Sequence, residues 1–314
     1  MRRLAPNLLL ALVVGALPLS AGAADVEDAA DPAPVELQSE TEVLSEPLPE
    51  AEAPTRRRFR DLKTGIMPGG DLFGPLIADP RWPHFSFGYQ YYINDPTFKD
   101  IGAVSFGETF TVYRLRLGSG LLEFGAQAGV FAIFDLDSSS FDLINADYMV
   151  ALTTAYRLGQ FSVLGRVFHQ SSHLGDEFLL RSTTPARVNL SYESVDLKLS
   201  YDFDAIRLYG GGGYLFDTDP SDLQPWSVQA GLEFRSPWPS LESRWRPIAA
   251  VDLQSREQND WDIDVSVRAG IQIDGVLASR SMQFLVEYFH GHSPNGQFFT
   301  RKVDYIGLGV HFHF

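Results

Sequence analysis

The stretch Tyr305-Ile306-Gly307-Leu308-Gly309-Val310-His311-Phe312-His313-Phe314 decides the fold of this chain of 314 residues. Its large apolar residues stand at every second position, namely Ile306, Leu308, Val310, Phe312 and Phe314. Successive side chains of a strand point to opposite faces, so this spacing predicts a strand with one apolar face. His311 and His313 then fall on the other, polar face.

The same period of two recurs in about twelve segments from Phe85 onward. We place these strands approximately at 84–94, 104–117, 120–135, 146–157, 160–171, 187–203, 205–217, 225–236, 245–256, 259–274, 280–291 and 302–314. They are longer than the usual five or six residues of a globular strand, and their polar faces carry charges such as Asp264 and Arg268. A polar lumen fits these faces better than a second apolar core. We therefore expect an all-β protein, a transmembrane antiparallel β-barrel of about 12 strands over residues 84–314.

The connections between these segments alternate in length. Tight turns are expected at Gly118-Ser119-Gly120, Leu158-Gly159 and Asp204, and longer loops at 95–103, 136–145, 172–186, 218–224 and 292–301. With a periplasmic N-terminus, the short turns fall on the periplasmic side, as bacterial barrels require. The segment 237–244 is the exception.

The N-terminal region predicts export. Met1-Arg2-Arg3, an apolar run to Leu19 and Ala21-Gly22-Ala23 are typical of a signal peptide over 1–23. Residues 24–60 contain ten acidic residues before Pro54 and then a basic cluster, which predicts a disordered acidic periplasmic tether with a basic end. Residues 61–83 would be a periplasmic lead-in segment to the barrel. The expected location is the bacterial outer membrane.

Composition excludes some classes of function. The formal net charge of -15 argues against nucleic acid as a partner. The absence of cysteine excludes thiolate chemistry and disulfides. A mean hydropathy of -0.08 fits a soluble protein and a transmembrane barrel equally, because the two faces of each barrel strand average out.

One polar constellation falls on a face that should meet lipid. Arg166 belongs in the lumen, so His169 and Ser171 on the same strand point outward. A neutral imidazole beside a hydroxyl on one face can act as the general base that activates it. The next strand carries Asn189, Ser191 and Glu193 on its outer face, and Asn189 could accept a hydrogen bond from the imidazole and orient it.

His169-Gln170-Ser171 with Asn189-Leu190-Ser191-Tyr192 resembles the outer-membrane phospholipase A family. The resemblance implies a twelve-stranded barrel that hydrolyses lipid acyl esters at the outer leaflet, with His169 as base, Ser171 as nucleophile and Asn189 as orienting residue. Glu193 is the alternative third member, because lipid A deacylases pair a His-x-Ser with a Glu on a smaller barrel, but the twelve-strand count favours Asn189. The family has Asn-Gly after the serine, where this chain has Ser172-His173.

The same resemblance implies calcium as a cofactor and a homodimer as the active state. Hard oxygen ligands are offered by Asp176 and Glu177, and by Asp137 and Asp142 in a neighbouring loop. The C-terminal strand ending on Phe314 resembles the assembly signal of outer-membrane barrels, which implies the barrel assembly machinery as a partner. The whole chain, with Gly74 to Trp82 and His169 to Leu179, also resembles an uncharacterised family of exported bacterial proteins.

The favoured hypothesis is thus a phospholipase A-type serine hydrolase that acts on membrane lipids. The alternative is a non-enzymatic barrel, either a narrow channel, a receptor or a structural protein. A soluble periplasmic β-sandwich is the third reading. Four further histidines, His290, His292, His311 and His313, are interpreted as lumen or loop polarity, and Gly210 to Gly213 as a thinned strand segment.

Overall fold

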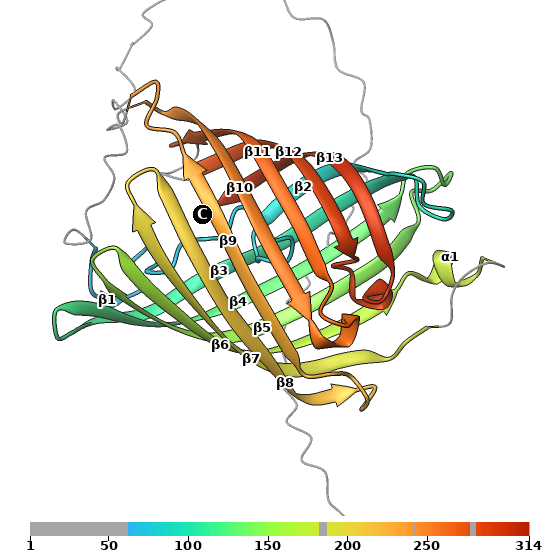
Figure 1. The fold of residues 1–314 in the computed structure, drawn as a ribbon, viewed down its shortest axis with the longest axis horizontal. Coiled ribbons are helices and arrows are strands. Elements are labelled where there is room, and N and C mark those ends of the chain that lie inside the picture. The colour runs from blue at the N-terminus through green and yellow to red at the C-terminus, as the bar shows by residue number, and fades with distance from the viewer. Residues whose placement is uncertain (1–61, 182–186, 241–242, 277–280, 314) are drawn as a thin grey trace, which may run out of the picture. The chain divides into compact units, whose positions relative to one another are not determined.

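The computed structural model describes residues 62–181, 187–240, 243–276 and 281–313. The predicted signal peptide, the acidic tether and Phe314 lie outside these residues. Within them, twelve antiparallel strands, β2 to β13, form a closed barrel (Figure 1). Each strand pairs with the next along the chain, and β13 pairs with β2 to complete the ring. The predicted all-β barrel of twelve strands is confirmed.

The strand bounds agree with the periodicity to within a few residues. The strands are β2 Phe85–Tyr92, β3 Asp100–Leu117, β4 Gly120–Asp135, β5 Leu143–Leu158, β6 Phe161–Leu174, β7 Leu190–Phe203, β8 Ile206–Asp219, β9 Trp226–Arg235, β10 Trp245–Arg256, β11 Ile263–Asp274, β12 Ser281–His292 and β13 Lys302–His313. A two-residue strand β1, Gly65–Ile66, pairs with β3, and the described helices are α1 Asp176–Leu179, η2 Glu257–Asn259 and η3 Gly296–Phe298. No helix within the described residues is long and apolar enough to cross a membrane.

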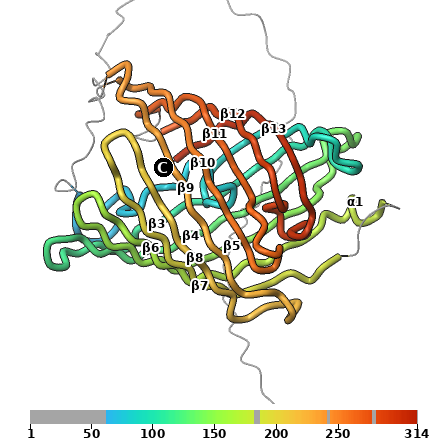
Figure 2. Tube along the Cα trace, in the orientation of Figure 1, coloured from blue at the N-terminus to red at the C-terminus, as the bar shows by residue number. Residues whose placement is uncertain are grey.

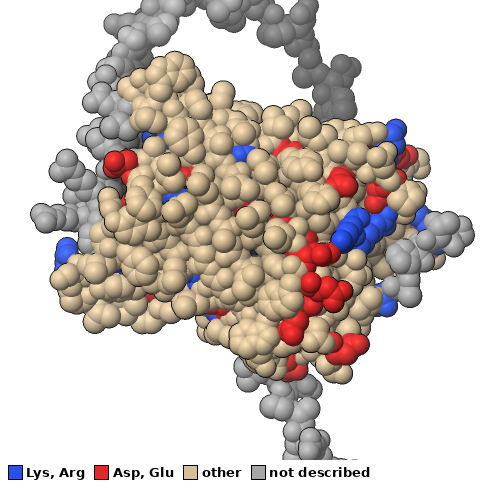
Figure 3. All heavy atoms as spheres, in the orientation of Figure 1, with Lys and Arg blue, Asp and Glu red and all other residues tan. Residues whose placement is uncertain are grey.

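The two faces of the barrel wall differ as the alternation predicts. Large apolar side chains are exposed on the outside, with Leu152 at 73% and Leu308 at 63%. The lumen side buries polar groups such as Gln127, Asp252 and Arg268. In the space-filling view, Figure 3, the side of the barrel is almost free of charged residues and the charges gather toward one end. Such an outer surface fits the hydrocarbon core of a bilayer.

Short turns and long loops occupy opposite ends of the barrel, as the tube in Figure 2 shows. The turns at Gly118, Gly159 and Asp204 all use positive φ angles, of 57°, 61° and 31°. Two-residue turns of this kind match the twist of the paired strands. The connection between β9 and β10 is the long exception among the turns. We call this end the turn end and the other the loop end.

The segment before β2 lies inside the barrel, where the sequence predicted a periplasmic lead-in. The backbone N–H of Leu72 donates to Glu123 on β4 at 2.9 Å, and the N–H of Ile77 donates to Glu233 on β9 at 2.8 Å. The carbonyl oxygen of Ile77 accepts a bond from Arg268 on β11 at 2.9 Å. Only the lumen gives access to strands so far apart around the wall. We call residues 71–84 the lumen segment.

Apolar burial and charge pairing together hold the lumen segment. Leu72, Leu76 and Trp82 are at most 1% exposed. The Trp82 ring lies 5.5 Å from the Arg166 guanidinium, close enough for a cation–π contact. The segment supplies backbone donors to buried lumen carboxylates, which would otherwise be left with unsatisfied oxygens at a high free-energy cost. The alternation of apolar and polar residues does not predict this arrangement, because the position of the lumen segment depends on which residues of the barrel wall surround it.

We predict that Glu233→Ala lowers the free energy of unfolding by about 3 kcal/mol, because it leaves the buried Arg207 and the half-buried Arg235 without this carboxylate and removes the anchor of Ile77. Urea unfolding of the refolded protein, followed by tryptophan fluorescence, measures the change. Glu177→Ala, an exposed site on α1, is the control and should shift the value by less than about 0.5 kcal/mol. Equal stability of the two variants would refute the anchoring role of Glu233.

Candidate functional site

The imidazole of His169 is held by a carboxylate on the neighbouring strand. His169 on β6 lies opposite Glu193 on β7 in the strand register. The distance from His169 Nδ1 to Glu193 Oε1 is 2.9 Å, a hydrogen bond, and the two side chains are 44% and 39% exposed. Ser171, two residues along β6, lies opposite Ser191.

All these side chains belong to the outer face of the barrel. On β6 the residues Ser162, Arg166 and Gln170 are buried toward the lumen. Their neighbours at odd positions, including Val167 at 51% exposed, face outward. His169 and Ser171 share the parity of Val167 and therefore lie on the outer face. Both stand closer to the loop end of β6 than to its turn end.

Asn189 takes a different partner from the one that the resemblance implies. It directly precedes β7, and its Nδ2 donates to Asp219 at the end of β8. Four residues separate it from Glu193, roughly 13 Å along an extended chain. The residue that the register brings to His169 is therefore Glu193, the alternative third member. The register of β6 and β7 thus places Glu193 opposite His169.

The bond to Glu193 prepares His169 for proton transfer. With the carboxylate accepting from Nδ1–H, the neutral ring presents the lone pair of Nε2 as a base. Ser171 is on the same face two residues away, roughly 7 Å between Cα atoms from the rise of a strand. Rotation about the side-chain bonds can bring the hydroxyl within reach of the imidazole. The arrangement supports removal of a proton from Ser171 by His169.

The backbone after Ser171 remains in the sheet. β6 continues to Leu174, and Ser172 pairs with Leu190 on β7 and Asp147 on β5. The Ser172 hydroxyl points to the lumen and donates to Asn145 at 3.2 Å. These backbone N–H groups serve the sheet ladder, so they do not form the turn that the phospholipase family places after its serine.

An apolar groove on the outer surface is lined in part by His169. Its volume is about 350 Å³. Rings from three strands line it, those of Phe85, Phe106 and Tyr148, with the Glu108 carboxylate also on its border. The width and lining of the groove suit a hydrocarbon chain.

Two further outer-face residues escaped the sequence reasoning. Asp217 on β8 is the cross-strand partner of Glu193, because a bulge at Phe216 shifts the parity of that strand. Counting by twos from Leu208 puts Asp217 on the lumen side, so no sequence signal identified it. The second is Tyr148, which lies opposite Ser171 and packs its ring 5.7 Å from that of His173.

The residues expected to hold calcium do not converge. Asp176 and Glu177 are exposed on the single turn of α1. Asp142 is instead bound to Arg181 at 2.6 Å, together with Asp135. Among the described residues no cluster of three or more His, Asp or Glu side chains is arranged to hold a metal ion. These side chains do not fit a calcium site, and no step is derived through calcium.

The other histidines are engaged in ion pairs or in the lumen. His292 contacts Asp264 at 3.0 Å, and His290 pairs with Asp304 near the loop end. His311 is 3% exposed and contacts Glu287 at 2.6 Å. The predicted lumen side of His311 is thus observed.

Known structures share this barrel. The chain is similar to outer membrane phospholipase A from Escherichia coli, with 13% identity, a TM-score of 0.54, and coverage of 79% of this chain and 96% of that one. It is also similar to a Salmonella typhi outer membrane phospholipase solved as a dimer with bound calcium, with 14% identity, a TM-score of 0.53, and coverage of 75% and 94%. At such identities the likeness concerns the fold.

A search of curated proteins finds no match. A family model described as "Protein of unknown function (DUF1207)" matches residues 32–314. The predicted resemblance to an uncharacterised family is thereby confirmed.

Arg181 joins the α1 loop to the neighbouring 136–142 loop. Hydrogen bonds from Ser140 and then Arg181 hold the pKa of Asp142 below its usual range. A depressed folded-state pKa contributes stability that is present above the unfolded pKa and is lost as pH falls below about 4. We predict that Arg181→Ala speeds proteolytic cleavage in these loops at pH 7. The difference in cleavage rate between the variant and the wild type should become smaller as the pH falls below about 4 and Asp142 becomes protonated. Gel analysis of timed digests measures it, and identical digestion at pH 7 would contradict it.

Proposed function

Since the chain belongs to this family of proteins of unknown function, we propose its activity from its own site: it is an outer-membrane acyl-ester hydrolase that acts on lipids at the outer leaflet. Ser171 is the nucleophile, His169 the general base and Glu193 the residue that orients the base. Glu193 takes the role that the sequence resemblance assigned to Asn189.

The observation that carries this proposal is the 2.9 Å contact between His169 and Glu193 on the lipid side of the wall. Ionisable groups on a lipid-facing surface are destabilising and rare. Most of the buried charge pairs in the described residues lie on the lumen side, such as Arg166 with Asp196. An imidazole and a carboxylate lie in register on the opposite, outer side, with a serine on the same face. A catalytic role explains these three groups better than a role in stabilising the fold.

The proposed reaction has two steps. Ser171 Oγ attacks the ester carbonyl carbon while His169 Nε2 takes its proton, and Glu193 stabilises the resulting imidazolium. His169 then returns the proton to the departing alcohol, leaving an acyl-serine. A water molecule, deprotonated by the same imidazole, attacks the acyl carbonyl; the bond to Ser171 Oγ breaks, His169 gives its proton to Ser171 Oγ, and the fatty acid is released. No backbone turn donates to the oxyanion, and one such donor is worth roughly a hundredfold or more in rate, so we expect slow turnover.

The apolar groove beside His169 supports a lipid substrate. An acyl chain lying along Phe106 and Tyr148 would be held in the groove that His169 helps to line. The lipid needs no extraction from the membrane, because the groove belongs to the surface that faces it.

The remaining parts of the proposal concern location and partners. We propose export by a signal peptide over 1–23, a tether over 24–60, and insertion into the bacterial outer membrane by the barrel assembly machinery through Phe314. A homodimer is proposed as the working state, by analogy with the solved phospholipase dimer. Calcium is left out of the mechanism.

We predict that Ser171→Ala and His169→Ala reduce fatty-acid release from phospholipid micelles to background, and that Glu193→Gln lowers kcat by at least about tenfold. Asn189→Ala should lower it less than Glu193→Gln does. A continuous assay of fatty-acid release by refolded protein gives the rates.

Ser191→Ala is the matched control, because Ser191 is the cross-strand neighbour of Ser171 on the same face. It should retain the wild-type rate. Equal rates for the Ser171→Ala, Ser191→Ala and wild-type proteins would end the proposal.

The channel alternative makes a separate prediction. The lumen segment and its charge network fill the barrel from the turn end, so we expect no steady conductance in planar bilayers at neutral pH. Single-channel recording with an open porin as positive control measures this. Stable ohmic steps from protein that folds normally would favour the channel.

A further inference from the structure

A second site lies inside the barrel, apart from the proposed outer-face chemistry. We propose that the lumen cavity at the loop end binds a small organic anion, a carboxylate or phosphate compound of about monosaccharide size. The cavity has the room for such a solute and the hydrogen-bond donors that an anion requires. The inference does not depend on the hydrolase activity.

The cavity is bounded by the wall and the lumen segment. Strands β6 to β10 form one side, and Asp79 and Arg81 of the lumen segment form the other. Loop residues from Leu223 to Pro225 and from Pro294 to Phe299 contribute its rim. Its volume of about 180 Å³ corresponds to roughly a dozen waters, or to a solute with a similar number of heavy atoms.

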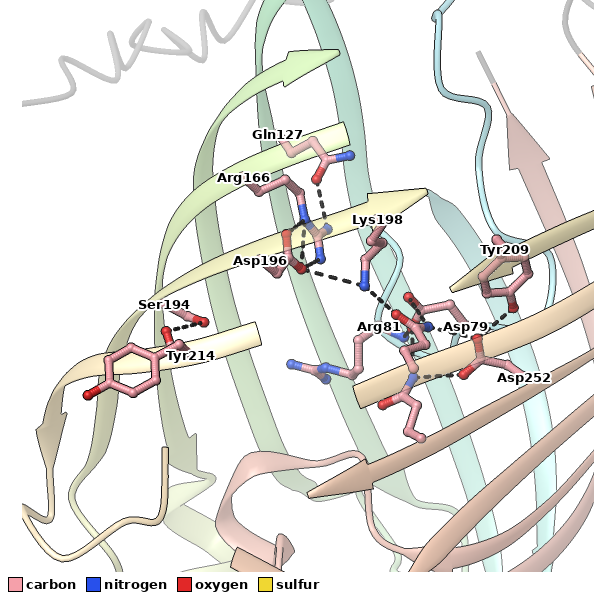
Figure 4. Close-up of polar contacts among 12 residues, drawn as sticks. Asp79, Arg81, Gln127, Arg166, Ser194, Asp196, Lys198, Tyr209, Tyr214 and Asp252 are labelled. Atoms are coloured by element: carbon pink, nitrogen blue, oxygen red, sulfur yellow. Dashed lines mark hydrogen bonds and ion pairs between the residues drawn. The ribbon is translucent and has the colours of Figure 1, made fainter. Parts of the chain in front are cut away.

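Cations outnumber carboxylates around this space. Four lining side chains carry positive charge, namely Arg81, Arg166, Lys198 and Arg256, and two carry negative charge, namely Asp79 and Asp196. Figure 4 shows Arg166 and Lys198 converging on Asp196, with Arg81 and Asp79 beside them. Arg81 is paired with Asp147 at 2.9 Å and Arg166 with Asp196, so Lys198 and Arg256 are the lining cations with the weakest ion pairing.

Both carboxylates already have donors on each oxygen. Arg166 binds Asp196 with two nitrogens, the Nε to Oδ1 distance being 2.9 Å. Asp79 Oδ1 accepts from the backbone N–H of Arg81 at 2.8 Å, and its Oδ2 accepts from Gln229 at 3.1 Å. Neither carboxylate is left with an oxygen that lacks a donor, so neither calls for a cationic ligand.

The cations retain donors. Lys198 has three N–H donors and contacts Asp196 at 3.5 Å and Gln229, which leaves one. Arg256 donates to Gln254 at 3.2 Å and, within the described part of the chain, has no carboxylate within ion-pair distance. Since the acceptors are used and the donors are not, the cavity matches a ligand that accepts hydrogen bonds and carries negative charge.

The walls add a preference for an organic anion over an inorganic one. The aromatic residues Phe168 and Tyr192, from β6 and β7, line the cavity beside the charged groups. A sugar or short carbon skeleton can pack against such rings while its charged group meets Arg256 and Lys198. The burial of Lys198, 6% exposed, strengthens its attraction for an anion relative to a surface lysine.

Calorimetric titration of the refolded, full-length protein tests this inference with three probes at constant ionic strength: glucuronate, glucose 6-phosphate and uncharged glucose. We expect saturable binding of at least one charged sugar, and at least tenfold weaker binding of glucose. Binding of the carboxylate alone or of the phosphate alone supports the inference and identifies the preferred group. Absence of saturable binding by both, or equal binding of glucose, overturns it.

Arg256→Gln and Lys198→Gln should each weaken binding of the charged sugar by at least tenfold. Arg116→Gln, an exposed arginine at the turn end, is the matched control and should leave binding unchanged. A change in the migration of each variant on SDS gels after heating confirms that the unheated protein is folded. Folded Arg256→Gln and Lys198→Gln proteins that bind like wild type would place the anion elsewhere and refute the site. Ser171→Ala should bind normally, which separates this result from the fate of the hydrolase proposal.

Discussion

The alternation of side chains along each strand is the constraint on which this structure depends. In a closed barrel the side chains of each strand face the membrane and the lumen in turn. Whether a residue stands at an odd or an even position along its strand therefore determines which of the two it meets. The apolar set on β13 obeys this rule, and so does the set on β6. A polar group on the outer parity is therefore an exception that needs an explanation. His169, Ser171 and Glu193 are such exceptions on adjacent strands.

The same constraint fills the interior with charge. Glu123, Glu233 and Arg268 all face inward, where they cannot be left without partners. The lumen segment answers this need with backbone N–H and C=O groups and with Trp82, so it is part of the barrel core. Where the segment and the wall leave space near the loop end, spare donors remain. The barrel thus presents two chemically distinct surfaces, an outer one that suits lipid esters and an inner one that suits a soluble anion.

Much of the fold could be predicted from the sequence. The period of two located all twelve strands, and Gly118, Gly159 and Asp204 located three turns with positive φ. The outward parity of His169 and Ser171 followed from Arg166 on the same strand. These successes share a cause, because each depends on neighbours within one strand or turn.

The parts that escaped prediction depend on distant contacts. The choice between Asn189 and Glu193 rests on the register between β6 and β7, which a single strand does not encode across a long connection. Asp217 was hidden by the bulge at Phe216. The position of the lumen segment depends on Glu123 and Glu233, which lie 51 and 156 residues away from their partners along the chain. Calcium was expected from the family resemblance, and Arg181 binds Asp142, one of the carboxylates considered as a ligand.

The central claim is that His169 activates Ser171 on the outside of the barrel. Mass spectrometry of the folded protein after treatment with a fluorophosphonate ester tests it most directly, because this reagent phosphonylates only activated serines. We expect a phosphonate adduct on the peptide that contains Ser171, none on Ser191, and loss of the adduct in His169→Ala. An unmodified Ser171 peptide in fully folded wild-type protein would contradict it.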